Sequence, residues 1–247
     1  VLVASGSTPS VWEMLQNLGH SIVEPVPSLF TFNIKDIRIK DLLGISVPNA
    51  EVKVVGTKLV ANGPLLITHW GMSGPAILRL SAWGARELSD KKYDFDVKIN
   101  WLGAAFTSET LIATLNNLKN SLAKKQVFSN PQFGISARLW QKLCTASDIS
   151  ETVRWAELDK KTTTALALQL TEGTYKVNGK STFKEEFVTA GGVSLKEINF
   201  KTFESRLFKN LFFAGEVLNI DAITGGFNFQ AAWTGGWIVA KAMCIEL

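Results

Sequence analysis

The segment that most restricts the fold of this chain lies near its carboxyl end, at residues 211–236, and has the sequence LFFAGEVLNIDAITGGFNFQAAWTGG. The apolar run at its start predicts a strand that is buried on both faces, as in the sheets of α/β proteins. The apolar stretch that follows Gly225 and Gly226 predicts a long helix. A strand, a glycine-containing loop and a helix in this order indicate a binding site at the carboxyl end of a sheet.

The residues of this loop suit a polar ligand. Glu216 follows Gly215 directly, so its carboxylate is expected at the strand end, where it can accept hydrogen bonds from sugar-like hydroxyl groups. Gly225 and Gly226 let the backbone approach a ligand, and the first N–H groups of the following helix suit a phosphate or an electron-rich carbonyl. A tight turn that only starts a helix explains the same residues, and the loop alone leaves both interpretations open.

Three further stretches contain small or titratable residues at predicted strand ends. Gly191 and Gly192 follow an apolar strand and allow close approach of a ligand, although an ordinary strand-end turn needs the same residues. His69, in the sequence ITHWGMSGPAI, can transfer protons near neutral pH, or it can simply hold a capped corner together. The small residues of ASGSTP at 4–9 either pass close to a ligand or close a turn between a strand and a helix.

Composition excludes several classes of protein. With 247 residues, 46% of them hydrophobic and 19% charged, the chain can bury a sizeable core and form more than one domain. The net charge is +4, but lysines and arginines are scattered singly or in pairs, which favours a solvated surface over a nucleic-acid partner. No apolar run reaches the length of a membrane span, since Lys241 interrupts the last candidate. We expect no membrane partner, and the oligomeric state is left open.

Cysteines and histidines limit the chemistry further. Cys144 and Cys244 are predicted to be buried free thiols in helices, which fits a reducing, cytoplasmic setting. His20 and His69 are the two histidines, so a multi-histidine metal centre cannot be assembled and we expect no metal. The chain also lacks the G-x-G-x-x-G, Walker-type G-x-x-x-x-G-K-[ST], H-E-x-x-H and G-x-S-x-G motifs. Hydrolase and metalloenzyme functions therefore lack support.

Hydrophobic periodicity divides the chain into four parts. Residues 1–25 predict a strand, a loop and a helix, and residues 26–105 are mostly strands, with a hairpin in EVKVVGTKLVANG and an alternating strand in YDFDVKINWL. Residues 106–175 predict helices, the first with a serine cap at Ser108. Residues 176–247 return to short strands before the final helix. The fold class is therefore mixed α/β, with a β-rich domain that carries a helical insertion.

Four motifs carry a resemblance to a known family: LLGIS, GPLLITHWGMSGPAIL, FVTAGGVSLKEINFKTFESRL and LFFAGEVLNIDAITGGFNFQAAWTGGW. Together they resemble the YhiN/BaiN-like flavoproteins, which are aminoacetone-oxidase-like NAD(P)/FAD-dependent oxidoreductases. The resemblance covers nearly the whole chain. It implies a two-dinucleotide-binding-type FAD domain, interrupted by a β-barrel-like domain that has its own helical insertion. It also implies that the glycine-rich FAD-fingerprint unit of the family precedes the part represented here, so tight FAD binding is not expected of these 247 residues alone.

The resemblance assigns roles to the loop residues. Gly215 and Glu216 would lie along the ribityl and pyrophosphate part of FAD, and Gly191 and Gly192 would belong to the same cofactor site. The residues that would approach the isoalloxazine ring are Gly225, Gly226, Phe227 and Asn228. Reduced flavin carries negative charge near its pyrimidine carbonyl, which the start of a helix stabilises.

The implied activity is that of a dehydrogenase. FAD would exchange a hydride with a small organic substrate, and NAD(P)H is a candidate partner. We hypothesise, from His69 and the small residues that follow it, that this histidine lines the substrate pocket as a catalytic residue. Two departures from the family pattern are ASGSTPSVW at the first strand and Asn219, where many members have aspartate. They leave a second hypothesis open, namely a non-catalytic binding module that retains the flavoprotein scaffold.

Overall fold

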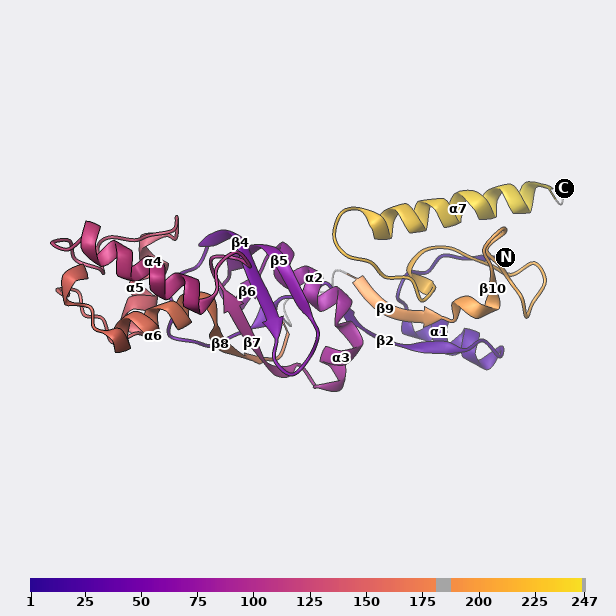
Figure 1. The fold of residues 1–247 in the computed structure, drawn as a ribbon. Coiled ribbons are helices and arrows are strands. Elements are labelled where there is room, and N and C mark those ends of the chain that lie inside the picture. Colours follow the sequence, from indigo (N-terminus) through magenta and orange to yellow (C-terminus); the bar gives the residue numbers. More distant parts are fainter. Residues whose placement is uncertain (181–187, 246–247) are drawn as a thin grey trace. The chain divides into compact units, whose positions relative to one another are not determined.

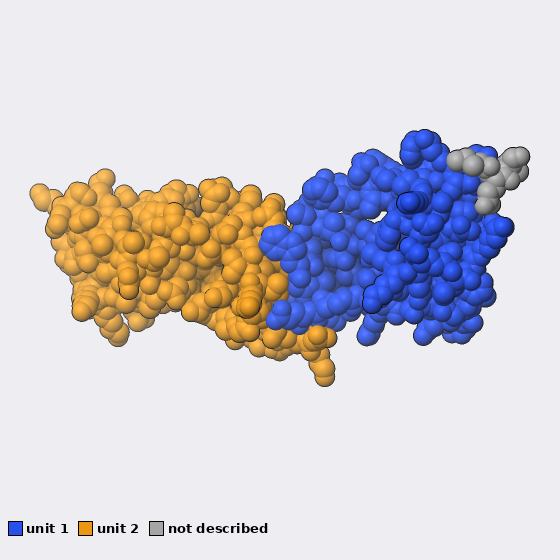
Figure 2. Space-filling view, turned by 45° about the vertical axis from the view of Figure 1, so that its right-hand side comes forward, with its two compact units in different colours: residues 1–30, 81–89, 184–247 blue, residues 31–80, 90–183 orange. Residues whose placement is uncertain are grey.

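The structure is a computed structural model, and it describes residues 1–180 and 188–245 (Figure 1). Phe187, the first residue of the FVTAGG motif, and the last two residues of the predicted final segment lie outside the described residues. Contacts between residues divide the chain into two units (Figure 2). Unit 1 comprises residues 1–30, 81–89 and 184–247, and unit 2 comprises residues 31–80 and 90–183.

Unit 2 contains a six-stranded sheet whose neighbouring strands are antiparallel, in the order β3-β6-β5-β4-β7-β8. These strands are β3 (Phe32–Asn33), β4 (Ser46–Val54), β5 (Val60–Ile67), β6 (Gly71–Ser73), β7 (Asp94–Asn100) and β8 (Gly173–Asn178). The two ends of the sheet meet, because the Asn33 amide donates to the Gly179 carbonyl at 3.1 Å and Phe32 bridges to Lys180. The predicted β-barrel is thereby confirmed as a nearly closed barrel.

Buried apolar side chains alternate with more exposed ones along the strands, and the buried ones fill the barrel. Val52, Val54, Leu65 and Val97 are fully buried, while their neighbours in sequence are more exposed. The predicted hairpin is formed by β4 and β5, and the alternating stretch YDFDVKINWL contains β7. Period-two patterning was therefore sufficient to predict the β4–β5 hairpin and strand β7.

The helical part of unit 2 lies between β7 and β8 in the chain, as an insertion into the barrel (Figure 1). It contains α4 (Ser108–Ser121), α5 (Ala137–Thr145), η1 (Trp155–Glu157) and α6 (Lys160–Thr171). The cap of α4 was predicted one residue too late, since Thr107 rather than Ser108 accepts from the Thr110 amide, at 3.2 Å, and forms a capping box. Trp140 and Trp155 are fully buried, so the insertion has its own core.

Unit 1 contains the first and last segments of the chain. Its elements are β1 (Leu2–Val3), α1 (Pro9–Asn17), β2 (Ile22–Ser28), β9 (Val188–Val193), η2 (Leu195–Glu197), β10 (Ile198–Asn199), β11 (Glu204–Ser205), β12 (Phe212–Phe213), η3 (Gly215–Val217) and α7 (Phe227–Ile245). β1 pairs in parallel with β12, and β2 pairs antiparallel with β9. Two further helices, α2 (Pro75–Trp83) and α3 (Ala85–Asp90), connect β6 to β7 in the chain.

The core of unit 1 joins the first helix to the final strand and loop. Trp12 and Leu15 pack with Phe213, Val217 and Val239, and the Trp12 indole donates to the Val217 carbonyl at 2.9 Å. This contact fixes the position of η3, which directly follows β12. No helix in the described ranges combines the length and the apolar character that crossing a membrane requires.

Candidate functional site

The loop between β12 and α7 starts with Gly215, whose backbone has a left-handed conformation that favours glycine. Gly215 has φ +78°, and η3 begins there. The Glu216 carboxylate accepts from the Thr189 amide at 2.7 Å, which ties η3 to the start of β9. One oxygen of the predicted ligand-binding carboxylate therefore holds the loop in place.

The second half of the loop is closed by a single side chain. The Asn228 amide oxygen accepts from the Ala222 N–H at 2.9 Å, and its NH₂ group donates to the Ala222 carbonyl at 2.9 Å. Gly225 and Gly226 lie at the exposed tip of this closed loop, with φ +127° and +84°. A Cβ on Gly226 would have no atom within 4 Å, so a ligand can approach this backbone directly.

The other predicted glycine pair has a different environment. Gly191 and Gly192 are buried in β9, where a Cβ on Gly191 would lie 2.5 Å from the Pro25 Cα atom. A Cβ on Gly192 would lie 2.5 Å from the Val217 carbonyl oxygen. Close packing of β9 against β2 and η3 therefore accounts for both glycines, and their role toward a cofactor stays a prediction.

A hollow of about 370 Å³ lies beside the glycine loop within unit 1, lined by Ala82, Trp83, Asp221, Ala222, Ile223 and Phe227. Burial raises the pKa of Asp221, while the Ser28 hydroxyl, 3.5 Å away, and the charge of Arg86 act in the opposite direction. Phe227 is 55% exposed at the start of α7. Sequence reasoning gave Asp221 no role of its own, because its burial depends on residues 28 and 83.

His69 lies in unit 2, whereas the loop residues from Gly215 to Asn228 and the glycine pair of β9 lie in unit 1. Its side chain is exposed and lines a hollow of about 660 Å³ together with Thr68 and Lys40. The catalytic role predicted for His69 stays a prediction.

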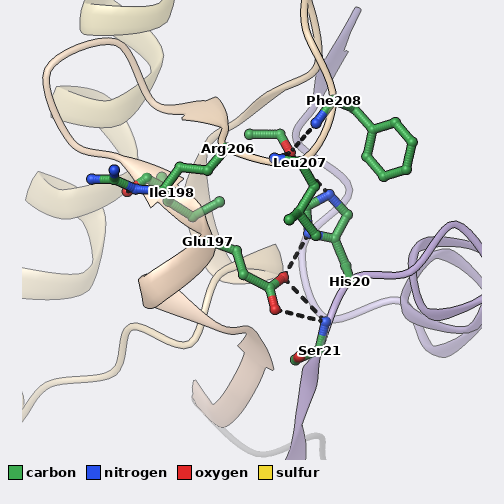
Figure 3. Close-up of polar contacts among 8 residues, drawn as sticks. His20, Ser21, Glu197, Ile198, Arg206, Leu207 and Phe208 are labelled. Atoms are coloured by element: carbon green, nitrogen blue, oxygen red, sulfur yellow. Dashed lines mark hydrogen bonds and ion pairs between the residues drawn. The ribbon is translucent and has the colours of Figure 1, made fainter.

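A polar cluster in unit 1 joins the buried His20 and Ser205 to the partly buried Glu197, and Figure 3 labels His20 and Glu197. His20 Nδ1 lies 2.8 Å from Glu197 Oε2, and His20 Nε2 lies 3.2 Å from Ser205 Oγ. Burial opposes ionisation of Glu197, but hydrogen bonds from Ser21 and His20 outweigh it and lower the pKa of this carboxyl. The cluster therefore links the start of β2 to η2 and β11.

This serine–histidine–acid order resembles that of a hydrolase triad, but its surroundings do not suit one. Ser205 is 7% exposed, and its Oγ accepts from the amides of Leu207 and Phe208, each at 3.0 Å. A nucleophile needs access to its substrate and a free lone pair. The cluster is a structural connection, which agrees with the absence of a nucleophile-elbow motif from the sequence. The described residues also contain no group of three or more histidine, cysteine or acidic side chains suited to a metal ion.

The model of a known protein family, the HI0933-like protein barrel and H2TH domain, matches residues 26–188, well over half of the chain. The chain belongs to the HI0933-like family. This family lies within the FAD-binding flavoprotein superfamily, so the resemblance inferred from the four motifs is confirmed at that level. The matched region contains the nearly closed barrel and the helices inserted between β7 and β8.

Curated relatives match almost the full length of this chain. Two ribosomal RNA dihydrouridine synthases, from Escherichia coli and Haemophilus influenzae, are 28% and 29% identical over 96% of it. A 3-dehydro-bile acid delta(4,6)-reductase from Clostridium scindens is 26% identical, also over 96%. The chain covers 56%, 56% and 58% of these three relatives, so it spans little more than half of their length.

Proposed function

We propose that the chain is part of a flavin-dependent oxidoreductase, in which the loop of residues 215–228 holds FAD. The observation that carries this proposal is the open backbone at Gly226, at the tip of a loop that Asn228 closes and at the start of α7. The first N–H groups of a helix have no partner within it, and they favour negative charge. This environment fits the pyrimidine carbonyl of a flavin.

The residues of the loop divide the binding between them. Gly225 and Gly226 would let the isoalloxazine ring contact the backbone directly, and Phe227 would make an apolar contact with the flavin. Glu216 still has an oxygen that can accept from a hydroxyl of the ribityl chain. When bound, the flavin supplies the hydride transfer, while the protein supplies position and charge.

The relatives' names favour reduction of a ring double bond. Dihydrouridine is uridine with two added hydrogens, and a reductase likewise adds hydrogen to its substrate. We propose a substrate with a carbon–carbon double bond next to a carbonyl, and NAD(P)H as the source of electrons. Such a reduction needs a proton as well as a hydride, and Asp221, which lies beside the glycine loop and whose pKa is raised by burial, is a candidate donor. His69 stays the second candidate for this role.

An equilibrium titration with FAD, followed by flavin fluorescence and visible absorption, tests the cofactor assignment. Gly226→Val adds a branched side chain where the isoalloxazine would lie, so it is expected to weaken FAD binding by about tenfold or more, or about 1.4 kcal/mol. Gly134→Val is the matched control, since Gly134 also has a positive φ (+71°) and an open Cβ position, but lies in unit 2.

Equal weakening by both variants would remove the loop from the proposed site. No flavin signal at any concentration from the full-length protein would favour the non-catalytic binding module, with the glycine loop as retained scaffold.

A further inference from the structure

Residues 35–43 of unit 2 form a ridge with a hollow on each side. The first hollow, of about 660 Å³, is lined by ridge residues and by Thr68, His69 and Gly71. The second hollow, of about 610 Å³, is lined by ridge residues and by Phe128 and residues of α5. Ile37 and Asp41 line both hollows, so the ridge separates them.

Arg38 connects the ridge to α6 and β8. This side chain donates to Asp36 Oδ1 at 2.8 Å and to Gln169 Oε1 of α6 at 2.8 Å. Its guanidinium group also lies 3.8 Å from the centre of the Tyr175 ring in β8. Because Arg38 neutralises Asp36, that carboxylate adds little negative charge to the hollows.

The remaining charge around the ridge is mainly positive. Lys35 and Lys40 line the first hollow, and Arg138 and Lys142 line the second. Asp41 is the one carboxylate among these lining residues that is not paired with Arg38, and its backbone carbonyl accepts from Arg138. Residues about a hundred positions apart in the sequence thus form one cationic surface.

Apolar and unpartnered polar groups accompany these charges. Ile37, which lines both hollows, is 76% exposed, and Leu42, Phe128 and Ala146 line the second hollow. At the first hollow, the Thr68 hydroxyl is buried and has no hydrogen-bond partner among the described residues. The lining of the two hollows therefore combines positive charge with apolar surface.

We propose that the ridge and its two hollows bind single-stranded RNA. Lysine and arginine side chains at the rims would contact successive phosphates, while unstacked bases would occupy the hollows against Ile37 and Phe128. Two relatives act on ribosomal RNA by name, which agrees with this partner. The proposal goes beyond the flavin function and does not depend on it.

Fluorescence anisotropy with a labelled twelve-nucleotide oligouridylate, measured from 50 to 200 mM salt without flavin, tests the proposal. The double variant Lys35→Glu, Lys40→Glu should lose two phosphate contacts, so we expect it to bind about 20-fold more weakly near 0.1 M salt. The slope of log K against log salt concentration should also become smaller in magnitude by about 1.4. Ile37→Ser removes no charge, so we expect weaker binding with an unchanged slope.

Lys53→Glu with Lys58→Glu is the matched control. It makes the same change in charge, but near the turn of the β4–β5 hairpin. This turn is at the opposite end of the hairpin from the Ser46–Leu66 pair. The proposal is overturned if the wild-type chain does not bind the oligouridylate at 50 mM salt, or if both lysine pairs weaken binding equally. It is also overturned if free uridine monophosphate competes as strongly as the oligomer, since the ligand would then be a small anion. FAD titration of the same variants is expected to be unchanged, so either proposal can fail alone.

Discussion

The two glycine pairs of unit 1 lead to expectations of different size for the same substitution. Gly192→Ala places a Cβ 2.5 Å from the Val217 carbonyl oxygen and 3.0 Å from the Leu218 carbonyl carbon, both of which are backbone atoms. Neither atom can move away by rotating a side chain, so β9 and η3 must separate. Gly226→Ala meets no atom within 4 Å.

The expected cost follows from these contacts. Overpacking of a buried site costs about 1–3 kcal/mol. A side chain at positive φ costs about 1–2 kcal/mol more, at Gly192 (φ +120°) as at Gly226 (φ +84°). Gly192→Ala should therefore reduce the free energy of unfolding by about 2–5 kcal/mol, and Gly226→Ala by about 1–2 kcal/mol. The first loss is a large part of the 5–15 kcal/mol that is typical of folded proteins.

Urea unfolding followed by tryptophan fluorescence measures this difference, because Trp12 is buried in the core of unit 1 beside η3. A lower midpoint with an unchanged m-value shows a loss of stability. Equal midpoint shifts for Gly192→Ala and Gly226→Ala would refute the argument, because strain at positive φ would then explain both and packing would explain neither.

Three further predictions concern titratable groups. Glu197→Gln should lower the free energy of unfolding by about 1–3 kcal/mol near pH 7, because the ionised carboxylate accepts a hydrogen bond from His20. Urea unfolding at a series of pH values should show that this difference from the wild type vanishes as the pH falls through the lowered pKa of Glu197. Asp221→Asn should gain stability relative to the wild type as the pH rises through the raised pKa of Asp221, in the same assay. A thiol-specific colorimetric reagent should label exposed Cys244 rapidly and Cys144, whose pKa burial raises to about 12, only after unfolding.

Sequence patterns predicted the barrel and the inserted helices, because their apolar residues repeat with the period of the element that they form. β2 was missed, since Pro25 and Pro27 remove two backbone donors and the pairing with β9 contains an irregularity between Val23 and Val26. The prediction that Cys244 is buried was wrong, because α7 is apolar on all sides while Cys244 lies on an exposed face.

The function of a glycine pair cannot be decided from the pair itself. The sequence predicted that Gly191 and Gly192 follow a strand, as the loop of Gly225 and Gly226 does, although they lie within β9, and both pairs have positive φ. What differs is the surroundings, since backbone from β2 and η3 fills the space in front of the first pair. Those neighbours are distant in the chain, so only the folded structure separates glycines that packing requires from glycines that a ligand can approach.

The same reasoning applies to charge. Along the sequence, Lys35 and Lys40 are as unremarkable as Lys53 and Lys58, and the scattered distribution favoured a solvated surface. In the fold, Lys35 and Lys40 line a hollow next to the one lined by Arg138 and Lys142, while Arg38 neutralises Asp36. The expectation of no nucleic-acid partner therefore rested on a linear count of charges, and an electrostatic surface is a property of their arrangement in space. Comparing these two lysine pairs on one RNA decides which view holds for this protein.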